Sequence, residues 1–295
     1  MALTHLPPQP PMSPEAERYA SWCVSQTAQA QDCTRHVLDI PYGSDYWHKL
    51  DIYQPEALSI QGVPVLLFMH GGYWSHGYKD WLGFMAPAFV SLPALFISVD
   101  YRLTPAAPYP AALDDCLDAL VWAYHHVTAY GGDPQQLFVG GHSAGGHLAA
   151  LMALQPERLV ACGLPADVIK ACFPVSGIYD LNNDLPQDCL QAFLPDIERR
   201  VEASPIHYIS GNRTPFLLSI GARDFPVLYQ QAYAMETALR REAAPVELLE
   251  IADVDHFQIN QKSGDANDRW VQHVRTWMQR TPPETHAINK PNPRG

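Results

Sequence analysis

Ser143 lies at the centre of a Gly-His-Ser-Ala-Gly segment, which has the GxSxG pattern of a nucleophilic serine. An apolar run at 137–139 precedes it, and a run of helix-forming residues at 148–151 follows it. The glycines at Gly141 and Gly145 leave room for a sharp turn from strand to helix, which would lift the serine hydroxyl out of a sheet. The segment has neither the GxGxxG nor the GxxxxGK[ST] pattern of a phosphate-binding loop. We therefore predict that Ser143 is a catalytic nucleophile.

A serine nucleophile needs a histidine base and an acid that orients this base, and both should follow it in the chain. His256 comes directly after the last apolar run, from where a loop could carry it over the serine. Asp224 follows the apolar run at 216–220, so it should emerge at the carboxyl end of a strand, where such an acid belongs. Asp253 and Asp255 lie next to the histidine and are expected on a solvated loop. The predicted triad therefore contains Asp224 and His256.

A second glycine turn, His-Gly-Gly-Tyr-Trp at 70–74, follows an apolar run. Attack on a carbonyl creates an oxyanion, and preorganised backbone N–H groups stabilise it. The candidate donors are the N–H groups of Gly72, Tyr73 and Ala144, the last being the residue after the nucleophile. Gly71 is an alternative for one of them. The two glycine turns together predict an oxyanion hole.

Strands alternate with helices along most of the chain. Compact apolar runs predict strands at 63–69, 94–99, 137–140, 169–175, 216–220 and 246–251. Apolar residues at helical spacing predict helices around 113–124, 228–239 and 270–278. Extended segments at 36–40 and 48–53 predict an antiparallel hairpin at a sheet edge. This alternation predicts an α/β fold with a mainly parallel, doubly wound sheet, whose chemistry lies at the carboxyl ends of the strands.

A chain of 295 residues is compatible with a single domain. We assign residues 1–35 to an N-terminal arm and a helix from Pro14 to Ala30, and residues 36–281 to one α/β domain. Within that domain, residues 178–213 interrupt the alternation and predict a small helical insertion that acts as a cap. Residues 282–295 form a C-terminal tail. No role is assigned to the Pro-rich arm or to the tail.

The composition restricts the possible partners. The formal charge is −12, and the few Lys and Arg residues form no basic stripe, so neither nucleic acid nor a membrane surface is an expected partner. The N-terminus lacks a signal-peptide pattern and no run is long enough to span a bilayer, which predicts a cytoplasmic protein. Six cysteines without a CxxC pair suit reduced thiols. We expect a small-molecule substrate, and a homodimer is one option for the assembly.

Together these motifs resemble the α/β-hydrolase family, and within it the kynurenine formamidase (arylformamidase) branch, which is close to the hormone-sensitive-lipase-like esterases. The resemblance runs from Tyr46 to Trp277. It is carried by LDIY at 50–53, HGGYW at 70–74, SVDYRL at 98–103, GHSAGGH at 141–147, VSGIYDL at 175–181, GARD at 221–224 and VDHF at 254–257.

The resemblance implies a serine hydrolase without metal or cofactor, with Ser143, Asp224 and His256 as the triad. It implies removal of the formyl group from N-formylkynurenine. Esterases that act on short acyl chains share the HGGxW loop, so a short-chain carboxylesterase, with amide or carbamate hydrolysis as an extension, is the alternative. A non-catalytic binding protein is disfavoured because all three triad members are present. A zinc hydrolase is disfavoured because the chain has no HExxH motif.

The residues expected to contact substrate are Tyr73, Trp74, His142 and Tyr179. Bulky aromatic side chains near the serine would favour a formyl group over long acyl chains, although Trp74 could equally belong to the core. A substrate with a carboxylate would need a local cation to offset the acidic surface. Arg102 and Arg223 are the candidates for this cation.

Overall fold

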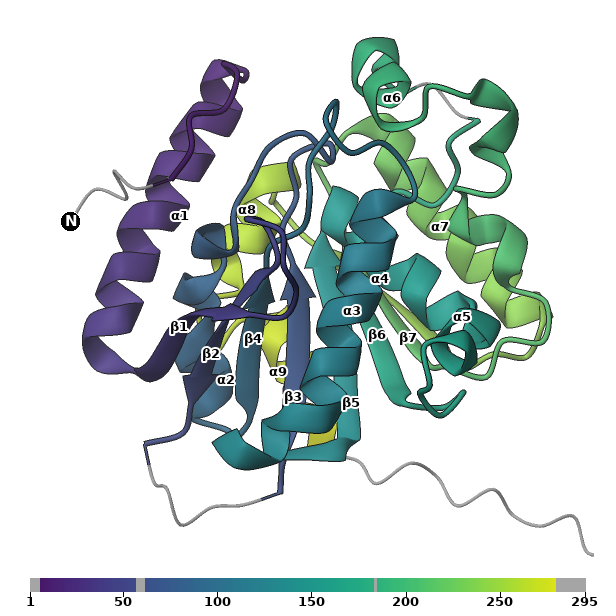
Figure 1. Cartoon of the computed structure of the whole chain (residues 1–295). Coiled ribbons are helices and arrows are strands. Elements are labelled where there is room, and N and C mark those ends of the chain that lie inside the picture. Colours follow the sequence, from purple (N-terminus) through teal and green to yellow (C-terminus); the bar gives the residue numbers. More distant parts are fainter. Residues whose placement is uncertain (1–5, 57–61, 183–184, 280–295) are drawn as a thin grey trace, which may run out of the picture.

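A sheet of eight strands runs through the molecule and carries helices on both of its faces (Figure 1). The structure is a computed structural model that describes residues 6–56, 62–182 and 185–279. The strands are, in chain order, β1 (Arg35–Pro41), β2 (Lys49–Gln54), β3 (Val63–Met69), β4 (Leu95–Val99), β5 (Gly132–His142), β6 (Ile169–Val175), β7 (Phe216–Gly221) and β8 (Val246–Ile251). Across the sheet their order is β1-β2-β4-β3-β5-β6-β7-β8. The pairs β1–β2 and β2–β4 are antiparallel and the other neighbours are parallel, which confirms the predicted α/β fold and its edge hairpin.

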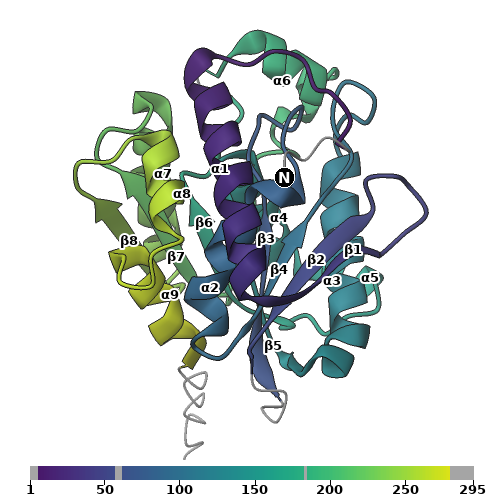
Figure 2. The same ribbon diagram turned by 90° about the vertical axis from the view of Figure 1, so that its left-hand side faces the viewer.

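Helices cover the sheet in two layers. Within the described residues they are α1 (Pro14–Cys33), α2 (Ala86–Val90), α3 (Ala111–His126), α4 (Ala144–Leu154), α5 (Pro156–Ala161), α6 (Gln187–Phe193), α7 (Pro226–Arg241), α8 (His256–Lys262) and α9 (Arg269–Gln279). The side chains of α3, α4, α5 and α7 join the core on one face, and those of α1, α2, α8 and α9 join the core on the other (Figures 1 and 2). This is the doubly wound arrangement that the alternating pattern predicts.

Strand β3 illustrates why the central strands are continuously apolar. Val65, Leu67 and Met69 pack into the core beneath α3 and α4, whereas Leu66 and Phe68 pack into the opposite core. Successive side chains of a strand point to opposite faces, so a strand covered on both sides must be apolar at every position. All five side chains are fully buried.

Helix α8 is absent from the sequence prediction, which places His256 on a loop that reaches over the serine and expects the neighbouring Asp255 to be a solvated loop residue. In the structure α8 starts at His256, and Asp255 is its N-cap. The Asp255 carboxylate accepts hydrogen bonds from the N–H groups of Phe257 (3.0 Å) and Gln258 (2.8 Å), and the Gln258 side chain accepts one from the Asp255 N–H. This capping box fixes the first turn of the helix and with it the position of His256.

Two segments lie outside the regular alternation of strands and helices: the predicted insertion and the N-terminal segment that contains α1. The predicted insertion, 178–213, contains α6 and short 3₁₀ turns at 197–200 and 205–208 in its described part. Helix α1 starts at Pro14 as predicted, and Ser13 Oγ caps it by accepting the Ala16 N–H at 3.3 Å. The predicted tail, 282–295, lies outside the described residues. Among the described helices, none has the length and apolar character needed to cross a membrane.

Candidate active site

Ser143 occupies the tight turn between β5 and α4. Its φ of 55° and ψ of −117° are unusual for a residue with a side chain, and such strain costs on the order of 1–3 kcal/mol. The Ser143 N–H donates a 2.9 Å hydrogen bond to the Val175 carbonyl on β6, which helps to hold the turn. A Cβ atom at Gly145 would lie 2.1 Å from the carbonyl oxygen of Met69. Only glycine therefore lets α4 begin against the end of β3.

Asp224 and His256 form a buried hydrogen-bonded pair. His256 Nδ1 lies 2.9 Å from Asp224 Oδ1, which also accepts the N–H of Phe225 at 2.7 Å. Ser176 Oγ donates to the other carboxylate oxygen, Oδ2, at 2.5 Å. Because the carboxylate accepts, His256 carries its proton on Nδ1 and presents an unprotonated Nε2. This is the tautomer that can take a proton from a serine.

The hydrogen bonds around Asp224 keep it ionised. Burial by itself raises the pKa of this carboxyl group, but the hydrogen bonds from His256, Ser176 and the Phe225 N–H outweigh burial and hold the pKa below its ordinary value. An ionised acid is the form that stabilises an imidazolium during the reaction. With the ionised Asp224 bonded to its Nδ1, His256 can act as a general base.

His142 lies against His256 and binds its backbone. Its Nε2 donates a 2.8 Å hydrogen bond to the His256 carbonyl, and the two rings are 4.7 Å apart. Burial, followed by the neighbouring His256, lowers the pKa of His142, so its ring is neutral and carries its proton on Nε2. Within the described residues no hydrogen bond joins Ser143 Oγ to His256, although both line one cavity. Such contacts are often long without substrate and tighten when it binds.

The loop at 70–74 packs against the Ser143 turn. A Cβ atom at Gly71 would lie 3.2 Å from Ser143 Cβ, so the loop and the serine are in direct contact. The loop turns through positive φ angles at Gly72 (119°) and Tyr73 (51°), and both residues line the cavity. In the described part of the chain, the N–H groups of Gly72, Tyr73 and Ala144 have no hydrogen-bond acceptor. These groups are therefore available to bind an oxyanion.

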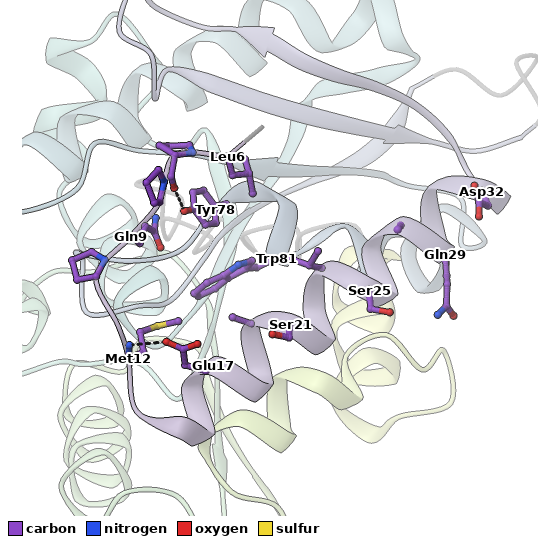
Figure 3. Close-up of a pocket in the computed structure, with 16 residues that line it drawn as sticks. Leu6, Gln9, Met12, Glu17, Ser21, Ser25, Gln29, Asp32, Tyr78 and Trp81 are labelled. Atoms are coloured by element: carbon purple, nitrogen blue, oxygen red, sulfur yellow. Dashed lines mark hydrogen bonds between the residues drawn. The ribbon is translucent and has the colours of Figure 1, made fainter. Parts of the chain in front are cut away.

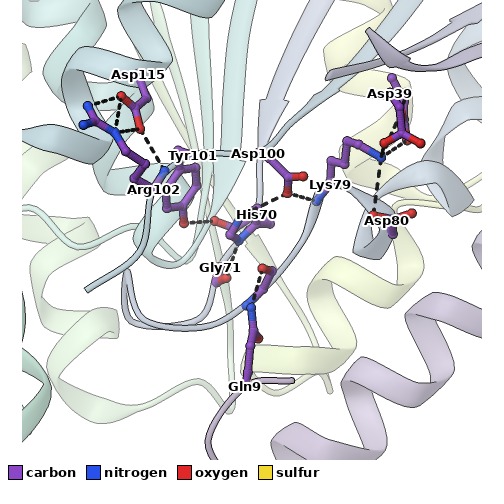
Figure 4. Close-up of polar contacts among 12 residues, drawn as sticks. Gln9, Asp39, His70, Gly71, Lys79, Asp80, Asp100, Tyr101, Arg102 and Asp115 are labelled. Atoms are coloured by element: carbon purple, nitrogen blue, oxygen red, sulfur yellow. Dashed lines mark hydrogen bonds and ion pairs between the residues drawn. The ribbon is translucent and has the colours of Figure 1, made fainter. Parts of the chain in front are cut away.

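The His70 side chain holds the loop at 70–74 in place (Figure 4). Its Nδ1 donates to the Gly71 carbonyl at 2.8 Å, and its ring stacks on Tyr101 at a centroid distance of 4.2 Å. The Tyr101 hydroxyl donates to the His70 carbonyl at 2.8 Å. Burial lowers the pKa of His70 to about 4, so the ring is neutral at pH 7.

A buried lysine anchors the chain just beyond the loop (Figure 4). Lys79 Nζ lies 3.0 Å from carboxylate oxygens of Asp39 and Asp51 and 3.4 Å from Asp80. Its backbone N–H donates to Asp100 Oδ1 at 2.6 Å. Burial alone would lower the pKa of Lys79, but the surrounding carboxylates raise it above its ordinary value. This cluster ties β1, β2 and the residue that follows β4 to the segment after the oxyanion loop.

The cavity at Ser143 has a volume of about 740 Å³. Its aromatic lining residues are Tyr19, Tyr73, Trp81, Phe225 and Phe257. Pro186 and Cys189 line it from the insertion, so the predicted cap reaches the site. Arg223 is the one Lys or Arg among the described residues that line this cavity.

The N-terminal arm and α1, for which the sequence predicts no role, form a wall of the same cavity. The lining residues from this segment are Pro11, Met12, Ser13, Glu15, Ala16 and Tyr19. The Gln9 side chain donates to the Gly77 carbonyl at 2.9 Å and accepts the Gly77 N–H at 2.8 Å. The Tyr78 hydroxyl donates to the Pro7 carbonyl (Figure 3). One face of α1 is buried and consists of Tyr19, Cys23, Thr27 and Ala30. Their spacing in the sequence indicates that the helix packs through this face, but it does not indicate which part of the protein the face packs against.

Two of the residues expected to contact substrate are buried away from the cavity. Trp74 is 1% exposed, its ring stacks on Phe193 at 3.9 Å, and its Nε1–H donates to His147 Nδ1 at 3.2 Å. Tyr179 is fully buried, and its backbone N–H donates to the Gln231 side chain. Trp74 therefore holds the oxyanion loop to α4 and α6, and neither residue lines the cavity. The other two, Tyr73 and His142, do line it.

Comparisons with known proteins place the chain in a family. The BD-FAE family model matches residues 50–239. The chain belongs to the BD-FAE family. It is similar to a kynurenine formamidase of Danio rerio, with 29% identity over 82% of this chain and 82% of the relative. It is also similar to the carboxylesterase NlhH of Mycobacterium tuberculosis, with 43% identity over 54% of this chain, and it spans about half (49%) of that relative.

The fold is shared with solved esterases. The structure of a hyperthermophilic esterase from the archaeon Pyrobaculum calidifontis matches this BD-FAE member with a TM-score of 0.72 and 20% identity, covering 93% of both chains. At this identity the match shows the fold alone. The predicted α/β-hydrolase resemblance and the predicted hydrolase class are confirmed by these comparisons.

The site of this BD-FAE member contains the groups needed for acyl transfer. Ser143 supplies a hydroxyl, His256 an unprotonated Nε2, and Asp224 an ionised acid behind it. The loop at 70–74 and the start of α4 supply unpaired N–H groups beside the serine. This set has the groups for nucleophilic substitution at a carbonyl carbon.

Proposed function

We propose that this BD-FAE member is a serine hydrolase that removes formyl and other short acyl groups from aromatic amines, as an arylformamidase does. One observation carries the proposal. Ser143, His256 with Asp224 bonded behind it, and the unpaired N–H groups of Gly72 and Tyr73 meet at one cavity, to which five Phe, Tyr and Trp side chains contribute walls. The 29% identity with a kynurenine formamidase over 82% of both chains supports the same activity.

The reaction follows from the positions of the groups. His256 Nε2 takes the proton of Ser143 Oγ as this oxygen attacks the formyl carbonyl. The N–H groups of Gly72, Tyr73 and Ala144 stabilise the resulting oxyanion. His256 then gives its proton to the leaving nitrogen, the C–N bond breaks, and the amine departs. Water, deprotonated by His256, attacks the formyl ester; the C–O bond to Ser143 breaks, His256 returns the proton to Ser143 Oγ, and formate departs.

The cavity suits an aromatic leaving group and a small acyl group. Aromatic rings prefer offset or edge-on contact with other rings, and Phe225 and Phe257 both lie beside His256, with centroid distances of 4.8 and 5.4 Å. Tyr73 is half-buried and lines the cavity next to the candidate oxyanion hole, where its side chain would restrict the space for an acyl chain. A formyl group needs almost no acyl pocket.

A short-chain carboxylesterase is the second candidate. The 43% identity with the carboxylesterase NlhH favours it, and the triad and the oxyanion hole would be the same. The difference lies in whether a formamide or an ester is the better substrate. Amide or carbamate hydrolysis would extend this second function.

The test is a comparison of kcat/KM for N-formyl-L-kynurenine and p-nitrophenyl acetate, with Ser143→Ala as the blank. A preference for the formamide by several orders of magnitude is the expected result. Similar kcat/KM values for the two substrates, or a higher value for the ester, would support the short-acyl esterase instead of the formamidase. Activity that survives in Ser143→Ala would remove the serine mechanism.

The proposal also covers partners and location. We propose a small-molecule substrate and a reaction without metal or cofactor, because nucleophile, base and acid are all side chains. Full activity after exhaustive chelation is expected. A cytoplasmic location and a homodimer stay predictions, which cell fractionation and light scattering would test.

A further inference from the structure

Arg223 brings a positive charge to the active-site cavity, and no carboxylate among the described residues pairs with it. Its Nη2 donates to the backbone carbonyl of Asp253 and to Gln258 Oε1, the latter at 3.1 Å. Both acceptors are uncharged groups, so they hold the guanidinium in place without neutralising it. A chain with a formal charge of −12 thus places an unneutralised cation at the cavity that contains Ser143.

The carboxylates near this cation are already engaged. Asp255 lines the cavity, but its carboxylate caps α8 by accepting two backbone N–H groups. Glu15 also lines the cavity, and its carboxylate lies 3.1 Å from Arg18. Asp224 is buried and bound by His256 and by two further donors. Arg223 therefore retains its charge for a ligand.

Arg102, the other cation that the sequence suggests for a substrate carboxylate, is already paired with an aspartate. Arg102 binds Asp115 through its Nε and Nη2 atoms, with Nη2 only 2.5 Å from the carboxylate. Arg102 does not line the cavity. Its role is to hold the loop after β4 to α3, so it cannot offset a charge on a substrate at Ser143.

The position of Arg223 beside His256 shows which part of the substrate it meets. The two groups that accept its hydrogen bonds belong to Asp253 and Gln258, which lie on either side of His256 in the chain. The Phe225 ring lies against the His256 ring, with 4.8 Å between the ring centroids. The base that takes the serine proton later delivers it to the leaving group, so the leaving group must lie next to His256. Arg223 and Phe225 are therefore on the leaving-group side of the cavity.

We propose that Arg223 and Phe225 form a subsite for an aromatic leaving group that carries a carboxylate. The guanidinium would bind the carboxylate through charge-assisted hydrogen bonds, and the half-exposed Phe225 ring would pack on the aryl ring. The substrate class is thus an acylated aromatic amine or phenol with an anionic group on the part that leaves. This inference rests on the proposed function in that it requires acyl transfer at Ser143.

The experiment uses two matched substrate pairs whose members differ only in a carboxylate on the leaving group. The ester pair is phenyl acetate and 4-acetoxybenzoate, and the amide pair is formanilide and 4-formamidobenzoate. For each pair we would measure the ratio of kcat/KM for the anionic to that for the neutral member. Arg223→Gln should lower this ratio on the order of tenfold or more, mainly through KM, because it removes hydrogen bonds between charged groups. Arg223→Lys should keep part of the ratio, since it keeps the charge.

Arg241→Gln is the matched control. It removes the same charge from an exposed position at the end of α7, about 22 Å along the helix axis from Pro226 at the cavity end. Its ratio should equal that of the wild type. Added salt should lower the wild-type ratio and leave the Arg223→Gln ratio nearly constant.

Three results would overturn the subsite. They are an unchanged ratio in Arg223→Gln, an equal fall in Arg241→Gln, and a wild-type enzyme that hydrolyses none of the four substrates. A wild type that hydrolyses both esters but neither formamide would reject the formamidase function alone. In that case the ester pair would still decide whether Arg223 binds the carboxylate.

Discussion

Ser176 Oγ donates a 2.5 Å hydrogen bond to Asp224 Oδ2, which leaves Oδ1 to face the His256 ring. Ser176 follows β6, and its own N–H is held by the Ser219 carbonyl on β7 at 2.8 Å. The acid is thus fixed by a serine from the neighbouring strand as well as by its own loop. Ser176 acts through Asp224 and His256, so we regard it as a positioning residue.

Ser176→Ala should lower kcat on the order of tenfold and leave KM nearly unchanged. The substitution removes a buried hydrogen bond to a charged group, and it raises the pKa of Asp224 toward its ordinary value. Ser219→Ala is the control, since Ser219 Oγ is buried and has no partner among the described residues. Equal losses of kcat in the two variants would show that packing, not the hydrogen bond, matters.

We expect the His142 side chain to position the catalytic base, His256, through its hydrogen bond to the His256 carbonyl. His142→Phe keeps a ring between Tyr19 and His256 but removes the side-chain hydrogen bond to the His256 carbonyl, so kcat should fall on the order of tenfold. His142→Gln places an amide donor near the same carbonyl and should recover part of the activity. Steady-state kinetics on both variants checks this. If His142→Gln is as slow as His142→Phe, ring packing explains the effect and the hydrogen bond does not.

The chemistry at the strand ends could be predicted because a parallel sheet brings the carboxyl ends of its strands to one edge. Ser143 follows β5, Asp224 follows β7 and His256 follows β8, so their meeting required only the strand assignments and the chain order. The start of α8 at His256 was missed because its signal, the Asp255 cap, is also the composition of a loop.

The walls of the cavity could not be predicted in the same way. Trp74 directly follows Tyr73, yet one is buried in the core and the other lines the cavity. Both have positive φ angles, 58° and 51°, and the direction of a side chain in such a turn does not follow from sequence spacing. The docking of the arm at Gly77 depends on Gln9, a contact across 68 residues that no periodic pattern encodes.

Gln9→Ala should raise KM on the order of fivefold with a smaller effect on kcat. The Gln9 amide makes two hydrogen bonds to Gly77, each worth about 1 kcal/mol, and they hold the arm that carries Pro11 and Met12 to the cavity. Gln29→Ala is the control, because Gln29 is exposed on α1 and does not line this cavity. An unchanged KM for Gln9→Ala would show that the arm does not shape the substrate site.

Acid should destabilise the protein through its buried histidines. Burial lowers the pKa of His70 and of His147 to about 4, below the ordinary value of 6.5. Between these values the unfolded chain binds more protons than the folded protein, so the stability is fully present above pH 6.5 and is lost as the pH falls toward 4. Each histidine should therefore cost about 2 kcal/mol between pH 7 and pH 5.

His147→Gln tests this pH dependence, because an amide can replace both ring hydrogen bonds, to Trp74 and to the Ala203 carbonyl, without titrating. The loss of unfolding free energy between pH 7 and pH 5, measured by urea denaturation, should be about 2 kcal/mol smaller than in the wild type. The comparison is made within each variant, so a general destabilisation by the substitution cancels. A loss in His147→Gln equal to that of the wild type would mean that this histidine is already protonated in the folded protein at pH 5.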